Sequence, residues 1–435
     1  MAYFMYVSLQ NDDKIAIFEM DPGSGKLQVE GSVAVNRPAP LAVDPERKFL
    51  FVGRRKPEDF GMSSFRIDRR SGGLSPVASI PLQGDPVHVA TDRKGKFLLS
   101  AYYYQQKVAV HAIGSGGDFG DPPVEWLQTD TGAHFIITDP SNKFALVPHI
   151  ADGALTGPNS IFQFKFDEDT GRLTPNAPPR VTAKEAEGPR HLCFHPDIDV
   201  VYSSNEQGCS VTAYRFDSAQ GTLAAIQTVP TLPEDYTGQN SCSQIQITPS
   251  GKFLYATNRG HNSIACFSID NSNGLLMPIG QVPTESVPRA FSLDPQGNFL
   301  YAAGLESGRL ACYRVNASTG SLELLEVNPR FWAWHGLAIA AGLGLPYITF
   351  AYAVGQNPIL GVMRQGIKWV RFLTDVRAAA HEIRSGRLSI RQYLTSLRGP
   401  TAFSVFSPSD PLPFIAEPFL LLLDRLIRFA DSKMT

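Results

Sequence analysis

Apolar and polar side chains alternate along short runs throughout residues 1–330, and a period of two is typical of half-buried β-strands. The runs are rich in Phe, Tyr, Ile and Val, and each ends at a turn. The clearest are KIAIFEMD (14–21), SIFQFKFD (160–167), SVTAYRFD (210–217) and RLACYRVN (309–316). The pattern predicts many short strands joined by tight turns, without crossover helices.

Two markers recur in register with these runs. The first begins with a Pro or Asp and a short turn, and ends with the residue that opens an apolar run. We call this last residue the marker, and it recurs at nearly even intervals: Phe49, Phe97, Phe144, Val200, Phe253 and Phe299. The second is Gly-x-Leu, at 25–27, 72–74, 171–173, 221–223, 274–276 and 320–322. The third repeat, around SGGDFG (115–120), is degenerate. Counting the first hairpin, which has no upstream marker, the repeats number seven.

Four short strands in each such repeat are the signature of a β-propeller. The alternatives are a parallel β-helix, for which the period is too long, and a β-sandwich, for which it is too regular. We therefore predict an all-β, seven-bladed β-propeller over residues 1–330. Residues 331–435 are predicted to form a separate, partly helical extension, because the formal charge changes from −7 to +5 at this boundary.

Propeller geometry converts sequence offsets into neighbours. The start of each innermost strand and the end of the next strand share one mouth of the central channel. The first set of positions, ten residues before each marker, holds Ala39, Val87, His134, Arg190, Ser243 and Arg289. The second, six residues after it, holds Arg55, Tyr103, Ile150, Glu206, Arg259 and Leu305. His88, His191 and Gln244 stand one step further along the innermost strands.

These positions vary between repeats and collect Arg, His, Tyr and a single Glu, whereas a structural position carries similar side chains. The expected mouth is electropositive and suits a small anionic ligand, since guanidinium groups match phosphate or carboxylate oxygens. Glu206 among several arginines would stay ionised and could accept a proton from water. The alternative is that the arginines form ion pairs that brace adjacent blades.

No cofactor or metal site is predicted, because Ca²⁺ needs several oxygen ligands and this mouth offers one carboxylate. His195 and His261 are interpreted as turn or hydrogen-bonded residues. The formal charge of −2 argues against nucleic-acid binding. Five scattered cysteines and an N-terminus without a secretory pattern indicate a reducing, cytoplasmic location. The oligomeric state is not predicted.

The later repeats contain four distinctive segments: EGPRHLCFHP (187–196), SNEQ (204–207), ITPSGKFLYATNR (247–259) and PTESVPRAFSLDPQGNFLYAAG (283–304). They resemble the bacterial propeller-type 6-phosphogluconolactonases of the seven-bladed lactonase family, and the resemblance spans residues 4 to 327. It implies metal-independent chemistry on a sugar-derived lactone of the pentose phosphate route. It also implies a site at Arg190, His191, Glu206, Arg259, Arg289 and His134, with Arg55 and Tyr103 facing the same mouth.

On this hypothesis the substrate phosphate binds one or more of Arg55, Arg259 and Arg289. Glu206 activates water, and Arg190 with His134 stabilises the oxyanion. Two alternatives stay open. One is a cycloisomerase like the fungal 3-carboxy-cis,cis-muconate lactonising enzymes of the same fold family, because arginines bind carboxylates equally well. The other is a non-catalytic binding scaffold, because a fold does not fix a function.

The extension has a composition of its own, with three of the four Trp and no Asp, Glu, Lys or Arg between Arg330 and Arg364. The segment WAWHGLAIA (332–340) is a poor candidate for the inner strand that a closed first blade needs. The uncharged run has some features of a membrane span, although five Gly and two Pro argue against one. Residues 364–397 and 418–430 suggest helices that could contact a partner or membrane surface. We favour a fused segment without a catalytic role.

Overall fold

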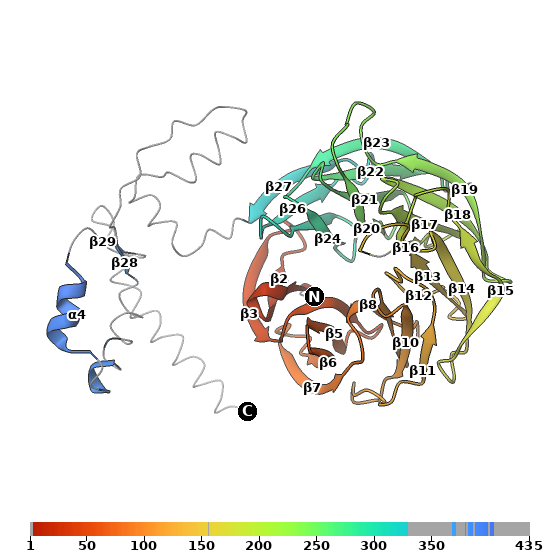
Figure 1. Cartoon of the computed structure of the whole chain (residues 1–435). Coiled ribbons are helices and arrows are strands. Elements are labelled where there is room, and N and C mark those ends of the chain that lie inside the picture. Colours follow the sequence, from red (N-terminus) through yellow and green to blue (C-terminus); the bar gives the residue numbers. More distant parts are fainter. Residues whose placement is uncertain are drawn as a thin grey trace. The chain divides into compact units, whose positions relative to one another are not determined.

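The computed structural model describes residues 3–154 and 156–328 and, near the C-terminus, residues 368–370, 379, 382–385, 388–398 and 401–403. The chain divides into two compact units, Met1–Pro329 and Arg330–Thr435. In the first unit the described strands form seven antiparallel sheets arranged in a ring (Figure 1). Six of these sheets have four strands, and the N-terminal sheet has three among the described residues. The predicted seven-bladed β-propeller is confirmed.

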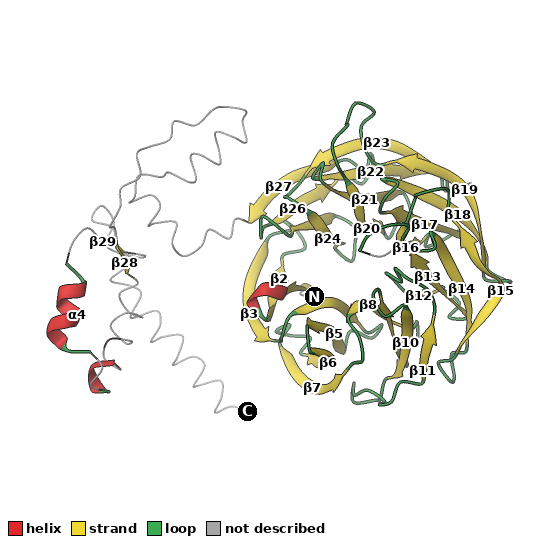
Figure 2. Cartoon of the chain, viewed as in Figure 1, coloured by secondary structure: helices red, strands yellow, loops and turns green. Residues whose placement is uncertain are grey.

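Each four-stranded blade begins with an innermost strand and continues outward by hairpins (Figure 2). The innermost strands are β4 (Pro38–Val43), β8 (Pro86–Thr91), β12 (Ile137–Thr138), β16 (Pro189–Phe194), β20 (Ser241–Ile247) and β24 (Pro288–Leu293). The second strands are β5 (Phe49–Lys56), β9 (Phe97–Tyr102), β13 (Phe144–His149), β17 (Val200–Asn205), β21 (Phe253–Arg259) and β25 (Phe299–Gly304). Every second strand therefore begins at a marker residue predicted from the repeat.

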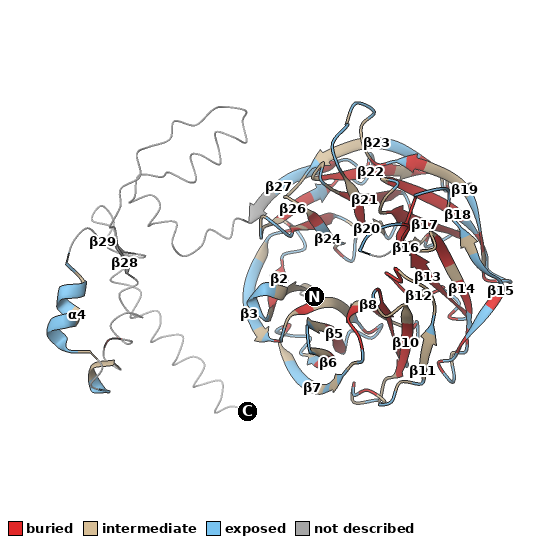
Figure 3. Cartoon of the chain, in the orientation of Figure 1, coloured by how far each residue is buried: buried red, intermediate tan, exposed pale blue. Residues whose placement is uncertain are grey.

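The outer strands carry exposed residues on one face, whereas the second strands are almost wholly buried (Figure 3). The third strands are β6 (Asp59–Ile67), β10 (Lys107–Ala112), β14 (Ser160–Phe166), β18 (Ser210–Asp217), β22 (Ser263–Ile269) and β26 (Leu310–Val315). The fourth are β7 (Leu74–Pro81), β11 (Glu125–Gln128), β15 (Leu173–Thr182), β19 (Thr222–Pro230), β23 (Leu276–Pro283) and β27 (Leu322–Asn328). The N-terminal blade holds β1 (Tyr3–Leu9), β2 (Lys14–Met20) and β3 (Leu27–Ala34), and η1 (Gln10–Asp12) is a 3-10 turn.

A buried carboxylate closes several of the turns between the innermost and second strands. Asp92, Asp139 and Asp294 each stand five residues before a marker and accept a hydrogen bond from its N–H, at 2.7–2.8 Å. These Asx turns use side-chain oxygens to bond backbone N–H groups that the sheet leaves unpaired. In these repeats the Asp that precedes the marker thus fixes where the second strand starts.

A ring-on-glycine contact joins neighbouring blades. The glycine of each Gly-x-Leu marker, or Gly117 in the degenerate repeat, has a positive φ, and a side chain that opens a second strand of the adjacent blade lies directly over its Cα. The pairs are Gly72 with Phe4, Gly117 with Phe49, Gly171 with Phe97, Gly221 with Phe144, Gly274 with Val200, Gly320 with Phe253 and Gly25 with Phe299. In four pairs a tyrosine two residues after the covering side chain donates to the glycine carbonyl: Tyr6, Tyr202, Tyr255 and Tyr301.

The last of these contacts brings the two ends of the propeller sequence together. Phe299 of β25 covers Gly25, and the Tyr301 hydroxyl donates to the Gly25 carbonyl at 2.8 Å. Met20 and Tyr3 of the N-terminal blade pack in the same apolar cluster as Phe299. The first and last blades are therefore in contact through side chains. The suggested closing strand at 332–340 lies outside the described residues.

In the second unit, β28 (Lys368–Val370) pairs in parallel with β29 (Thr401–Phe403), and α4 (Ile390–Ser396) begins at a Ser389 capping box. The helix predicted across 364–397 is therefore wrong at Lys368–Val370, where Trp and Val favour an extended strand. It agrees with α4. The uncharged run 331–363 and the predicted helix 418–430 lie outside the described residues. None of the described helices is long and apolar enough to cross a membrane.

Replacing Gly25 tests the contact between the first and last blades. Gly25 has φ 74°, and a Cβ would lie 2.4 Å from Phe299. Gly25→Ala should therefore destabilise the propeller by about 2–4 kcal/mol, through left-handed strain and overpacking. Thermal unfolding followed by near-ultraviolet circular dichroism measures the loss. Gly31→Ala is the matched control, because a Cβ there meets nothing within 4 Å. Equal melting temperatures for the two variants would contradict the role of this contact.

Candidate active site

Glu206 lies between two arginines from neighbouring blades. It follows β17, and its Oε2 is 2.7 Å from Nε of Arg190 on β16, while its Oε1 is 2.9 Å from an Nη of Arg259 at the end of β21. The backbone of Glu206 is held on both sides, because its N–H donates to Gly188 and its carbonyl accepts from Cys242. The carboxylate is therefore fixed relative to both guanidinium groups.

Burial and the neighbouring charges shift the pKa of Glu206 in opposite directions. Burial raises the pKa of Glu206, but Arg190 and Arg259 outweigh it, and the net pKa lies below its ordinary value of 4.5. Arg190 is 2% exposed. Burial lowers its pKa to about 9, opposed by Glu206 and reinforced by Arg259 and Arg289. Both groups therefore stay ionised at neutral pH, and the carboxylate is in the form that accepts a proton.

Two more arginines extend the positive charge, with different partners. Arg289 on β24 has no ion pair with a carboxylate among the described residues, and burial followed by repulsion from Arg259 and Arg55 lowers its pKa. Arg55 at the end of β5 instead forms a two-pronged ion pair with Asp85, with both N···O distances 2.5 Å. The structure therefore leaves Arg289, and not Arg55, open to a ligand anion. The prediction that Glu206 is the mouth's single carboxylate is wrong, because Asp85 is a second.

Three imidazoles line up beside Arg190. The ring of His191 lies 5.4 Å from that of His134 and 5.9 Å from that of His88. Burial, followed by repulsion from Arg190, lowers the pKa of His88 to about 3 and holds the pKa values of His134 and His191 well below 6.5. All three are neutral at pH 7. His191 Nε2 is 3.0 Å from Nη1 of Arg190, so a neutral His191 accepts this hydrogen bond.

His134 is placed differently from its two neighbours. It is buried, and its Nδ1 has no hydrogen-bond partner among the described residues. Its ring contacts the edge of Tyr103, which is itself buried and packs beside Gly153. The structure thus brings His134, Arg190, His191, Glu206, Arg259 and Arg289 into one cluster. Tyr103 borders this cluster behind His134.

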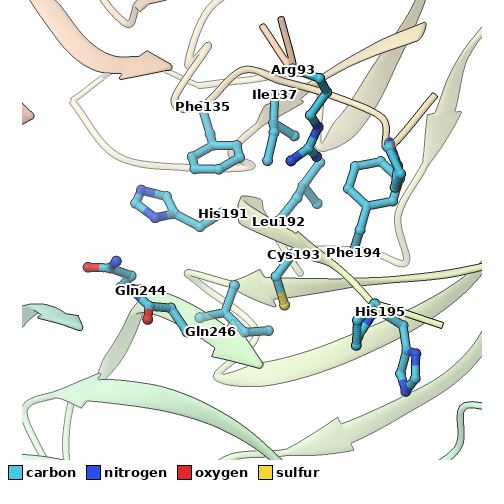
Figure 4. A pocket seen from close by; sticks show the side chains of 13 residues that line it. Arg93, Phe135, Ile137, His191, Leu192, Cys193, Phe194, His195, Gln244 and Gln246 are labelled. Atoms are coloured by element: carbon cyan, nitrogen blue, oxygen red, sulfur yellow. The ribbon is translucent and has the colours of Figure 1, made fainter. Parts of the chain in front are cut away.

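His191 also lines a cavity of about 440 Å³ (Figure 4). Phe135, Leu192 and Phe194 give it a mainly apolar wall, and Gln244 and Gln246 face it from β20. Much of its polar lining is already bonded: Gln246 bonds the backbone of Phe291 and Leu293, and Arg93 donates to the carbonyls of Thr138 and Asp139. Glu206, Arg259 and Arg289 are not among the residues that line this cavity. In the described part of the chain no cluster of His, Cys, Asp and Glu could hold a metal ion.

Comparison with known proteins agrees with this architecture. The sequence profile of the family described as "Lactonase, 7-bladed beta-propeller" matches residues 14–331. The chain belongs to this family. It is 32% identical over 295 residues to a 6-phosphogluconolactonase of Yersinia pestis, covering 68% of this chain and 85% of that protein. A 6-phosphogluconolactonase of Serratia proteamaculans is 31% identical over 294 residues, with coverages of 68% and 86%.

Solved structures of the same architecture superpose on this lactonase-family chain. A candidate 6-phosphogluconolactonase from Bacteroides fragilis is 25% identical, with a TM-score of 0.67 and coverages of 75% and 94%. A periplasmic gluconolactonase from Pseudomonas aeruginosa, at 21% identity, shares the fold with a TM-score of 0.69 and coverages of 76% and 96%. The recognised family and the class of enzyme, a lactone hydrolase, are thereby confirmed, whereas the roles of individual residues stay predictions.

Sequence reasoning about this lactonase missed Asp85. The residue immediately precedes Pro86, the first residue of β8, and so falls just outside the two sets of offsets considered. A usable signal exists, because Pro38, Pro189 and Pro288 also open innermost strands. Residues before these prolines therefore border the same mouth.

The neutral histidines make stability depend on pH in a definite direction. An unfolded histidine binds a proton below about pH 6.5, whereas half-buried His88 in the folded protein does so only near pH 3. Stability should therefore fall as pH decreases from 7 to 5, by up to about 1.4 kcal/mol per pH unit for each such histidine. His88→Asn, which can keep an acceptor near the Ile136 N–H, should flatten this slope in denaturant titrations. Gln244→Asn, at the equivalent position of β20, should not. Identical slopes for all three proteins would contradict a neutral His88.

Proposed function

We propose that the protein hydrolyses 6-phosphoglucono-δ-lactone to 6-phosphogluconate. The observation that carries the proposal is the Arg190–Glu206–Arg259 ion-pair group with Arg289 beside it. It combines an ionised carboxylate that can accept a proton with a guanidinium that lacks a carboxylate partner among the described residues. The names of the Yersinia and Serratia relatives support the same substrate.

The substrate would bind mainly through the charge of its phosphate group. Arg289 would hold the phosphate, with Arg259 nearby, since charge-assisted hydrogen bonds to phosphate oxygens are among the strongest that side chains form. Arg55 would contribute through the field of its pair with Asp85 and not as a direct ligand. Tyr103 and His191 would shape the wall: His191 orients Arg190, and Tyr103 packs against His134.

The chemical step would be direct hydrolysis. Glu206 takes a proton from a water molecule, whose oxygen attacks the lactone carbonyl carbon. Arg190 and neutral His134 stabilise the oxyanion of the tetrahedral intermediate. The intermediate collapses with cleavage of the bond to the ring oxygen, which receives the proton from Glu206. Water is thus added across one ester bond. The low pKa weakens Glu206 as a base, but a δ-lactone is a reactive ester and needs only modest assistance.

We assign the reaction to the propeller and place the protein in the cytoplasm. Every proposed site residue lies within Met1–Pro329, and the family profile ends at residue 331. The extension therefore has no part in the proposed chemistry. The five cysteines are free thiols, which suits a reducing compartment. The proposal involves a small anionic lactone as partner, without nucleic acid or membrane.

Glu206→Gln tests the general base. This variant should lower kcat/KM by about 10²–10⁴-fold, because it removes the proton acceptor. It should bind the product 6-phosphogluconate at least as tightly as the native protein, since a negative charge has left an arginine-rich site. Turnover of the phosphorylated lactone and calorimetric product binding measure the two effects.

The control for this variant is Asp85→Asn, which neutralises the second carboxylate of the same mouth. It should leave kcat/KM within about tenfold of the native value, since the Asp85 side chain pairs with Arg55 and not with Glu206, Arg190 or Arg259. Equal losses in both variants would remove Glu206 as the base. Activity confined to a muconate substrate would overturn the proposed function.

Arg289→Ala tests the phosphate site. The KM for 6-phosphoglucono-δ-lactone should rise by about 10–100-fold, the equivalent of one charge-assisted interaction. The KM for unphosphorylated glucono-δ-lactone should stay near its native value. Steady-state kinetics with both lactones provide the comparison, and Arg215→Ala, on an exposed position of β18, is the matched control. A similar loss with both lactones would show that Arg289 does not bind the phosphate.

A further inference from the structure

Two thiols lie directly behind the Glu206–Arg259 ion pair. Cys209 is in the turn that follows Glu206, and Cys242 is the second residue of β20 in the next blade. Two linked asparagines hold the sulfur atoms near each other, because Asn240 Nδ2 contacts the Cys209 sulfur and also donates to Asn258 Oδ1, which the Cys242 thiol reaches. Both are free cysteines; Cys209 is half-buried and Cys242 is buried. The fold thus brings together two cysteines from different repeats of the sequence.

The surroundings of the two sulfur atoms are polar. Asn240 Nδ2 donates to the Cys209 sulfur at 3.3 Å, and Thr231 Oγ1 lies 3.2 Å from the Cys242 sulfur. The Cys242 thiol also reaches Asn258 Oδ1 at 3.5 Å. These contacts differ from the apolar setting of a buried structural cysteine, which is chemically inert.

The same two segments hold the candidate active site. The Cys242 carbonyl accepts a 2.8 Å hydrogen bond from Arg259, through the same nitrogen that pairs with Glu206. The Cys242 N–H donates to the Glu206 carbonyl at 3.0 Å. Only Gln207 and Gly208 separate Glu206 from Cys209. A movement of either sulfur is therefore transmitted to the ion pair through short, directly bonded backbone.

The two thiols are prepared for different roles. The hydrogen bond from Cys242, opposed by burial and reinforced by Asn240 and Arg259, lowers the pKa of Cys209 to about 6. The same hydrogen bond, together with burial, raises the pKa of Cys242 well above its ordinary value. Cys209 is thus a thiolate at neutral pH and the nucleophile of the pair, while Cys242 keeps its proton.

We propose that Cys209 and Cys242 form a reversible disulfide that displaces Arg259 from Glu206 and lowers turnover. The oxidant is a hydroperoxide. The Cys209 thiolate attacks the peroxide and becomes a sulfenic acid, releasing hydroxide, or an alkoxide from an organic peroxide. The Cys242 sulfur then attacks the Cys209 sulfur, and its proton leaves with the sulfenic hydroxyl as water. Two electrons pass from the sulfurs to the peroxide. The claim about turnover rests on the proposed lactonase function; the disulfide does not.

Bond formation forces a rearrangement. Both thiols are free, so their sulfurs must approach from van der Waals contact or beyond to about 2.05 Å, a movement on the order of 1 Å or more. Either the turn after Glu206 or the start of β20 must supply it. Both segments bond the Glu206–Arg259 pair, so its geometry changes in either case.

The test uses the reduced full-length protein, treated with hydrogen peroxide. Remaining thiols are then alkylated and the digest is analysed by mass spectrometry. Cys209 and Cys242 should be recovered in linked peptides, lighter by two hydrogens than the separate pair. Cys193, Cys266 and Cys312 should be alkylated once the protein is denatured. The kcat/KM should fall by about 10–100-fold, the cost of a displacement near 1 Å, and recover with dithiothreitol.

Hydrogen–deuterium exchange reports the coupling without a substrate. The peptide containing Cys242 should exchange faster after oxidation, because its N–H hydrogen bond to Glu206 is disturbed. If the reduced protein hydrolyses no lactone, the proposed function fails, while the linked peptides and the exchange rate still decide this inference. The absence of linked peptides would overturn it. A linked protein with unchanged exchange and turnover would overturn the coupling.

Two variants distinguish the effect of the Cys209–Cys242 disulfide from the effect of oxidation elsewhere in the protein. Cys209→Ser should keep kcat/KM of the reduced enzyme within about twofold, since its side chain contacts no proposed catalytic group. It should form no link and resist peroxide. Cys193→Ser, which replaces another half-buried cysteine, should link and lose activity as the native protein does. Peroxide inhibition that persists in Cys209→Ser would show that the inhibition arises elsewhere.

Discussion

The packing of a side chain, usually phenylalanine, over a left-handed glycine holds one blade against the next, and the remaining architecture depends on that contact. A side chain on the glycine would collide with its neighbour, and only glycine adopts the required φ without strain. Where a tyrosine follows two residues later, its hydroxyl satisfies the glycine carbonyl, so the polar backbone is buried with a partner. Seven such contacts, one for each pair of adjacent blades, set the angular step between blades. That step places strand ends from different blades at one mouth.

The mouth is costly to maintain, because it buries charge. Arg190 loses nearly all contact with water, and its pairing with Glu206 offsets only part of that loss. The backbone bonds to Gly188 and Cys242 keep the carboxylate fixed, so the pair does not relax outward. A fixed, ionised pair in a dry setting is a feature expected of a catalytic site, since electrostatic stabilisation is strongest where dipoles and charges are already oriented.

The fold follows closely from the sequence, because each marker has a local physical cause that repeats. Phe49 and Phe299 open second strands in blades far apart in the chain, and both follow a carboxylate that bonds the marker N–H. Which side chains pair with each other at the mouth is harder to predict from the sequence. Offsets bring Arg55 to the mouth, yet its ion pair with Asp85 depends on rotamers and on a position outside the repeat offsets. The Lys368–Val370 strand was missed because its parallel partner, Thr401–Phe403, lies far along the chain and gives no periodic signal.

The polar side chains that line the cavity next to His191 affect how well that cavity can accept an anionic ligand. Gln246 and Arg93 have hydrogen-bond partners in the backbone of neighbouring strands, so they offer little to replace the hydration shell of a sugar acid. Apolar rings occupy much of the remaining wall. An anionic ligand that moved from the mouth into this cavity would therefore lose hydration water without an equivalent replacement. The wall thus discriminates ligands by hydration and favours retention of an anion at the mouth.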